Sequence, residues 1–160
     1  MPKSLPPHER LNELLRYEDG RLYWRVRRGN SAAGAEAGRI NNGRLQVRVD
    51  GVEYFVHRIV WAMHRGHDPH HTIDHINGDP LDNRIENLRD VPLAINCHNR
   101  RSPSRANKTG YLGVYVCRGR HVAQITVAGR TRRIGSYDSA REAHEAYVRV
   151  KRELHPGNLL

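Results

Sequence analysis

A polar stretch in the middle of this 160-residue chain constrains its fold more than any other part of the sequence. Residues 72–76 and 85–89 have the composition of strands, and residues 77–84 between them are rich in Asn, Asp, Gly and Pro, which favour turns. Pro92 then suits the first turn of a helix that we expect over residues 92–101. The pattern predicts a ββα unit, in which a hairpin with a polar loop is followed by one helix.

Polar residues of this unit can act together on a phosphodiester bond. In a ββα unit, His75 on the first strand and Asn96 on the helix can converge, and Asp74 supplies an anionic oxygen for a hard cation. Hydrolysis requires a base near neutral pH and a divalent cation that neutralises charge on the phosphate. Imidazole titrates in that range, so His75 suits the base. Taken singly, these residues and Asn87 fit a strand or a turn without function, but their joint spacing favours a nuclease site.

The segment from about residue 54 to residue 100 resembles the HNH nucleases, in the asparagine-rich variant of phage and intron-encoded homing endonucleases. The resemblance is carried by HRIVW at 57–61, DHINGDPLDNRIENLR at 74–89 and NCHNR at 96–100. It implies a metal-dependent phosphodiester hydrolase that cuts double-stranded DNA in the cytoplasm of a bacterial host. The implied cofactor is Mg²⁺, or another divalent cation such as Mn²⁺.

The same resemblance implies a role for each residue of the motif. His75 is the general base, and Asn87 holds the loop and orients that base. Asp74 and Asn96 bind the metal ion. His98 departs from the run of asparagines usual in the family and is a second candidate for a ligand role.

The charge of the chain is distributed unevenly. The net charge is +10, and all but three of the 27 basic residues are arginines. Residues 1–97 carry a net charge of +1, whereas residues 98–160 carry +9. Because a guanidinium donates paired hydrogen bonds to phosphate and to guanine, this asymmetry favours nucleic acid binding over a basic face that serves solubility alone.

The C-terminal part predicts a three-stranded antiparallel sheet packed on one helix. Strand patterns cover residues 112–117, 121–128 and 131–137, and a capping box from Ser139 to Glu142 starts a helix that we expect to end near residue 155. Apolar residues recur along one side of that helix. The helix should therefore cover one face of the sheet and leave the other face for a partner.

This part resembles the plant-type ethylene-response-factor (AP-two) DNA-binding domain. The shared motifs are Gly113-Val114, Gly119–Ile125, Ile134–Tyr137 and Ala143–Tyr147. The resemblance implies that the sheet enters the major groove. The residues that it places against DNA are Tyr115, Cys117, Gln124, Thr126, Thr131 and Arg133 on the sheet, with Arg118, Arg120, Arg130 and Arg132 near phosphates. His121 and Arg133 stand where the family commonly has tryptophan, so the plant target sequence does not carry over.

Together these patterns predict an α+β protein with two domains. A ββα-metal HNH nuclease domain should occupy residues 1–101, a linker residues 102–108 and the DNA-binding domain residues 109–160. Within the first domain, residues 44–56 predict a hairpin with an Asp-Gly turn, followed by a helix over residues 57–65.

Two other classes of protein fit parts of the pattern. A DNA-binding regulator or architectural protein would keep the basic C-terminal part with an inactive ββα unit. An RNA-binding module fits the charge, but aromatic residues make up only 6% of the chain and offer little surface for stacking. The loop histidines between His64 and His71 suggest zinc, yet Pro69 interrupts them and no thiolate completes the site.

The remaining composition limits the cellular setting. No apolar run approaches the roughly 20 residues of a membrane span. Cys97 and Cys117 form neither a disulfide framework nor a C-x-x-C metal pair. The first residues lack the apolar stretch of a secretory signal, so we expect the protein to stay in the cytoplasm.

Overall fold

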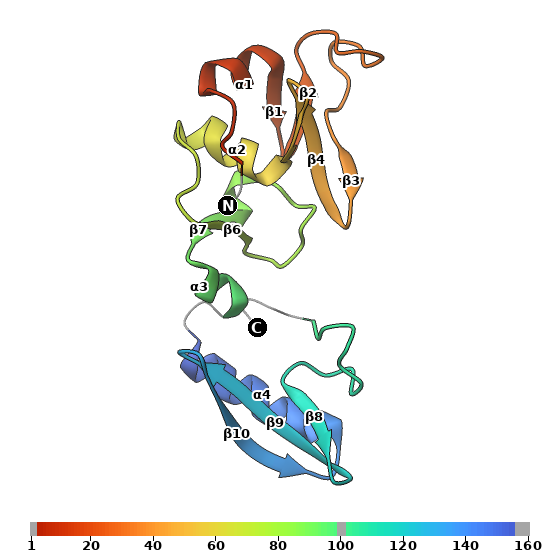
Figure 1. Cartoon of the computed structure of the whole chain (residues 1–160), viewed down its shortest axis with the longest axis vertical. Helices are drawn as coiled ribbons and strands as arrows, with labels where there is room; N and C mark the ends of the chain where they lie inside the picture. The colour runs from red at the N-terminus through yellow and green to blue at the C-terminus, as the bar shows by residue number, and fades with distance from the viewer. Residues whose placement is uncertain (1–2, 99–101, 156–160) are drawn as a thin grey trace. The chain divides into compact units, whose positions relative to one another are not determined.

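The computed structural model describes residues 3–98 and 102–155, and over these residues the chain has four α-helices, one 3₁₀ helix and several small antiparallel sheets. It divides into two compact units, Met1–Pro92 and Leu93–Leu160 (Figure 1). The division falls at Pro92, earlier than the predicted linker at residues 102–108. Pro92 has no backbone N–H to continue a strand ladder, and the strand before it ends at Val91.

The described part of the first unit contains two α-helices, one 3₁₀ helix and three antiparallel sheets. Strands β1 and β2 form one hairpin, β3, β4 and β5 form a three-stranded sheet in that order, and β6 pairs with β7. The elements are α1 (His8–Leu14), β1 (Leu15–Glu18), β2 (Arg21–Trp24), β3 (Arg39–Asn41), β4 (Arg44–Val49), β5 (Val52–Phe55), α2 (Val56–Arg65), β6 (Thr72–His75), the 3₁₀ helix η1 (Ile85–Asn87) and β7 (Leu88–Val91).

The predicted hairpin of residues 44–56 and the helix after it are confirmed. Asp50 and Gly51 have φ angles of 47° and 84°, which is the conformation that a two-residue hairpin turn requires. Helix α2 follows β5 directly and ends at Gly66, whose φ of 76° gives a left-handed cap.

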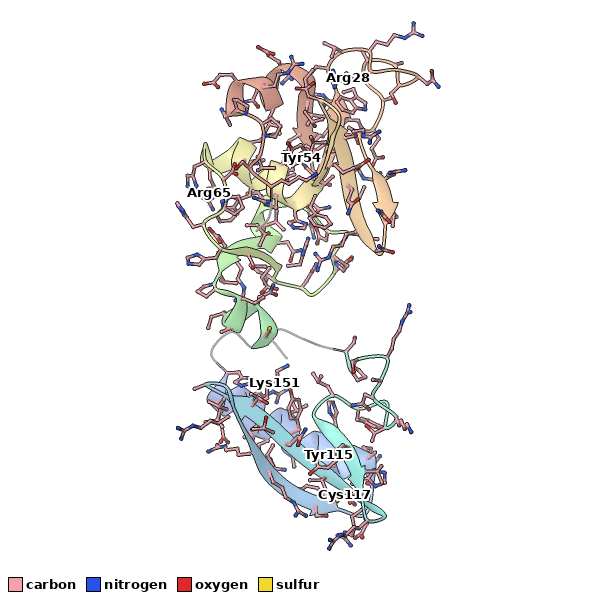
Figure 2. The ribbon with its side chains drawn as sticks, viewed as in Figure 1. Arg28, Tyr54, Arg65, Tyr115, Cys117 and Lys151 are labelled. Carbon is pink, nitrogen blue, oxygen red and sulfur yellow. The ribbon has the colours of Figure 1, made fainter. Side chains whose placement is uncertain are left out.

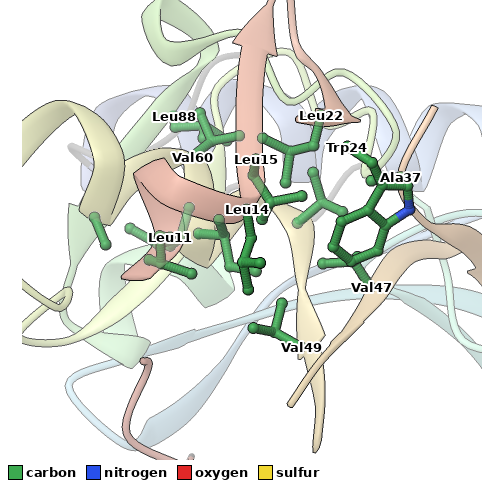
Figure 3. Close-up of a cluster of buried hydrophobic side chains, with 14 residues drawn as sticks. Leu11, Leu14, Leu15, Leu22, Trp24, Ala37, Val47, Val49, Val60 and Leu88 are labelled. Atoms are coloured by element: carbon green, nitrogen blue, oxygen red, sulfur yellow. The ribbon is translucent and has the colours of Figure 1, made fainter. Parts of the chain in front are cut away.

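A single apolar core holds the first unit together (Figure 3). Leucines from α1 and the β1–β2 hairpin meet Val47 and Val49 of β4 and the buried face of α2. Ile73 of β6 and Leu88 of β7 belong to the same core, and each is only 4% exposed. These two residues anchor the β6–β7 hairpin, which carries the predicted catalytic residues.

The predicted ββα order is present along the chain, with one shift. The second strand begins at Leu88 rather than at residue 85, because residues 85–87 form a turn of 3₁₀ helix in which the backbone N–H of Asn87 donates to the carbonyl of Arg84. Helix α3 (Leu93–His98) follows β7 and lies in the second unit by the division above.

The second unit is a three-stranded sheet with a long helix. Its elements are β8 (Val114–Cys117), β9 (Arg120–Val127), β10 (Arg130–Tyr137) and α4 (Ala140–Leu154), and the strand order is β10-β9-β8. The hydroxyl of Ser139 accepts a hydrogen bond of 3.2 Å from the backbone of Glu142, as the capping box predicts. Ala143 and Tyr147 of α4 form one apolar cluster with residues of β8 and β9.

Part of the predicted linker is built into this second unit. The side-chain amide of Asn107 donates to the carbonyl oxygens of Tyr111 and Val114 at 3.0 and 3.1 Å, and Thr109 bonds to the Asn107 side chain. These bonds attach the segment to the start of β8. Among the described residues, no helix is both long and apolar enough to cross a membrane.

Candidate active site

His75 lies at the end of β6 and is the centre of the candidate site. Its side chain is only 6% exposed, and its Nε2 lies 3.1 Å from Oδ1 of Asn83, which is itself buried. Burial lowers the pKa of His75 below its ordinary value, while the hydrogen bond to Asn83 acts in the opposite direction. The lowered pKa keeps the imidazole neutral near pH 7, which is the form that can accept a proton.

A second buried histidine packs against His75. The ring centroids of His57 on α2 and His75 are 5.2 Å apart with the rings nearly perpendicular, and the Phe55 ring stacks on His57 at 5.3 Å. Burial, together with the smaller effects of the charges of His75, Arg44 and Arg58, lowers the pKa of His57 to about 3. In the sequence, His57 belongs to the HRIVW motif and has no assigned role, so this contact was not predicted.

Asn87 holds the loop between β6 and β7. Its side-chain oxygen accepts from the backbone N–H of Asn77 at 2.9 Å, and its amide nitrogen donates to the carbonyl of Asp82 at 2.7 Å. These two bonds join the Asn87 side chain to the backbone of the loop, and the role expected for Asn87 stays a prediction. A side chain that hydrogen-bonds to the His75 ring is that of Asn83, which the sequence pattern did not distinguish from the other turn residues.

Asp74 is buried and forms an ion pair with the guanidinium of Arg89 across the hairpin. Its carboxylate is opposite Arg89 in the strand register, and the Nε and Nη2 atoms of Arg89 donate to Oδ2 at 2.9 and 2.7 Å. Arg89 therefore compensates the charge that burial would otherwise make costly. A carboxylate is a hard oxygen donor of the kind that Mg²⁺ and Ca²⁺ prefer, which fits the predicted ligand role.

The other predicted metal ligands lie on α3. Asn96 is half-buried, and it belongs to the second unit, whereas Asp74 and His75 belong to the first. The approach of Asn96 to Asp74 therefore stays a prediction. The side chain of His98 lies outside the described residues. Over residues 3–98 and 102–155, no group of three or more His, Cys, Asp or Glu side chains is placed to hold a metal ion.

The predicted DNA-contact residues of the sheet share one face. Ala123 and Ile125 of β9 pack with α4, so the alternating residues Gln124 and Thr126 point to the opposite face. Register places Thr131 opposite Thr126 and Arg133 opposite Gln124, and their two threonine hydroxyls are 2.7 Å apart. On β8, Tyr115 pairs with Val122 and Cys117 with Arg120, which puts both on this open face (Figure 2).

The flanking arginines differ in their surroundings. Arg118 lies in the β8–β9 turn with a φ of 49°, and Arg120 forms an ion pair with Asp138. Arg130 and Arg132 pair with Val127 and Ile125 across the strands and so lie on the side of the sheet that carries α4, where both remain exposed. The ten predicted positions thus surround the sheet, but only part of them share its open face.

A comparison with known protein families matches the segment of the chain that carries His75. Residues 54–98 match the family described as HNH endonuclease. No curated protein and no solved structure matches the chain. The matched segment runs from β5 to the end of α3 and includes Asp74, His75, Asn83, Asn87 and Asn96.

Residues 54–98 are therefore similar to an HNH endonuclease domain, and this match suggests DNA endonuclease activity. HNH nucleases act on DNA and generally use divalent metal ions. The match does not extend to the β8–β10 sheet, and the resemblance of the second unit to the ethylene-response-factor domain stays a prediction.

Proposed function

We propose that this protein is a site-directed DNA endonuclease of the homing type. The first unit hydrolyses a phosphodiester bond with a histidine base and one divalent cation, and the second unit directs it to its target. The observation that carries the proposal is the buried His75, whose ring is held by Asn83 inside the segment that matches HNH endonucleases.

Each residue of the site has a task in this reaction. The imidazole of His75 takes a proton from the attacking water, and Asn87 keeps the loop beside it closed. Asp74 and Asn96 would hold the cation, Mg²⁺ or Mn²⁺, through one carboxylate and one amide oxygen. When bound, the cation neutralises charge on the phosphate and on the departing 3′ oxygen. Arg89 holds the Asp74 carboxylate in place before the cation arrives.

The second unit binds the target DNA through the open face of its sheet. This face carries Gln124, Thr126, Thr131 and Arg133, whose side chains can donate to base edges. The exposed Arg118, Arg130 and Arg132 contact phosphates from the margins of the sheet. Support comes from the net charge of +9 over residues 98–160, which favours a polyanion.

Cleavage of supercoiled plasmid tests this proposal. Purified protein is incubated with plasmid DNA in Mg²⁺, and a matched sample contains a chelator in excess. We expect conversion to nicked or linear DNA with Mg²⁺ and none with the chelator. Binding without cleavage under every cation tested would instead make the protein a DNA-binding regulator with an inactive nuclease domain.

A further inference from the structure

We propose that Asn83 is a positioning residue that fixes the tautomer of His75, so that Nε2 carries the proton and Nδ1 carries the lone pair that accepts one. The inference rests on the proposed function, in which His75 is the base. It goes further by naming the residue that orients the base and the ring nitrogen that reacts.

The hydrogen bonds of Asn83 determine the direction of its amide group. Its Nδ2 donates to the carbonyl of Leu81 at 3.2 Å, so Oδ1 is the atom that faces His75. An amide oxygen only accepts hydrogen bonds, and the Nε2 of His75 lies 3.1 Å from it. Nε2 must therefore be the protonated nitrogen. In a neutral imidazole the other nitrogen, Nδ1, is then unprotonated.

The β1–β2 hairpin, near the start of the chain, helps to hold Asn83 in this position. Asn83 is 1% exposed, and Gly20 in the β1–β2 turn lies close to the backbone of Asn83 and Arg84. A Cβ atom built on Gly20 would lie 2.9 Å from the backbone nitrogen of Arg84 and 3.3 Å from the carbonyl carbon of Asn83. The hydroxyl of Tyr17 also accepts a hydrogen bond of 3.2 Å from the backbone N–H of Ile85. The β1–β2 hairpin thus supports the loop that orients the base.

Other residues shape this loop without touching His75. The Asn77 side chain donates to Asp82 at 2.7 Å, and Asp82 accepts from Arg84 at 2.7 Å. Asn77 is exposed, whereas Asn83 points inward to the ring. Asn77 is therefore a matched control, because its replacement removes an asparagine bond in the same loop but leaves the contact with His75.

Kinetics of three variants separate positioning from general loop stability. We expect Asn83→Ala to lower kcat for DNA cleavage by roughly 10- to 100-fold while KM stays close to wild type, as for other residues that orient a reacting group. Asn83→Asp still accepts from Nε2–H and should restore most of kcat. Asn77→Ala should leave kcat close to wild type. Equal losses in Asn83→Ala and Asn77→Ala, or no loss in either, would overturn the positioning role.

¹⁵N NMR of the protein without DNA gives a readout that does not depend on cleavage activity. Protein labelled with ¹⁵N-histidine is compared with His75→Gln to identify the His75 signals. We expect Nε2–H in the wild type and a mixture of tautomers in Asn83→Ala. A wild-type protein with Nδ1–H, or an Asn83→Ala protein with an unchanged tautomer, would refute the inference. The NMR result is independent of the plasmid assay. Even if the protein does not cut DNA, the spectra still show whether Asn83→Ala changes the tautomer of His75.

Discussion

Acid should unfold the first unit because His57 is buried in its neutral form. The pKa of His57 falls from 6.5 to about 3 in the folded protein, first because of burial and then because of the charges of His75, Arg44 and Arg58. Above a pH of about 6.5, both the folded and the unfolded states hold a neutral imidazole, and His57 has no effect on stability. Below that pH, the unfolded state binds a proton that the folded state does not.

The size of the effect follows from the width of this window. Each pH unit between the two pKa values removes about 1.4 kcal/mol from the free energy of unfolding, so the loss reaches about 5 kcal/mol as the pH approaches 3. Between pH 6 and pH 4 the loss should be about 2.5 kcal/mol. Burial also lowers the pKa of His75, which adds a loss of the same sign.

Urea unfolding followed by tryptophan fluorescence measures this loss in the first unit, because Trp24 and Trp61 are the only tryptophans of the chain. His57→Phe keeps a ring between Phe55 and His75 but cannot bind a proton. We expect the free energy of unfolding of this variant to fall less steeply with acid than that of wild type. The difference in slope should correspond to the uptake of about one proton fewer on unfolding. His67→Gln, at an exposed histidine of the same unit, is the control. Equal slopes for wild type and His57→Phe would refute the reasoning.

Three further predictions concern the metal, the fold of the second unit and DNA recognition. Asp74→Ala should raise the Mg²⁺ concentration needed for half-maximal cleavage, and so should Asn96→Ala, because each removes one oxygen donor; an unchanged metal titration would exclude that residue as a ligand. Gly113→Ala should destabilise the second unit by about 2 to 4 kcal/mol, since its Cβ would lie 2.1 Å from the Tyr147 ring at a φ of 78°; a thermal melt by circular dichroism that matches wild type would contradict this packing. Arg133→Ala should relax discrimination at one base pair by roughly 1 to 3 kcal/mol, whereas Arg130→Ala should weaken binding to all sequences alike, as binding titrations on target and scrambled duplexes can measure.

Local sequence signals predicted those parts of the fold that depend on neighbouring residues. The Asp50-Gly51 turn and the capping box at Ser139 both act within a few residues, and the hairpin and the helix that they predict are present. The apolar side of the C-terminal helix likewise predicted that this helix covers one face of the sheet and leaves the other open.

Contacts between distant segments could not be predicted from the sequence. Tyr17 and Ile85 are 68 residues apart, and the support that the β1–β2 hairpin gives to the β6–β7 loop depends on how these segments pack. The loop contains several asparagines and aspartates with equal turn propensity. Only the path of the backbone decides that Asn83, rather than Asn87, reaches the His75 ring. The 3₁₀ turn that delays the second strand also follows from this path.

The rate of a single turnover by His75→Ala tests the central claim most directly. DNA is held at a concentration below that of the protein, and the affinity of each protein for the same DNA is measured in parallel. Because His75 acts in the chemical step, we expect the cleavage rate to fall by roughly 10²- to 10⁴-fold with the dissociation constant close to wild type. A cleavage rate near that of wild type would contradict the assignment of His75 as the base.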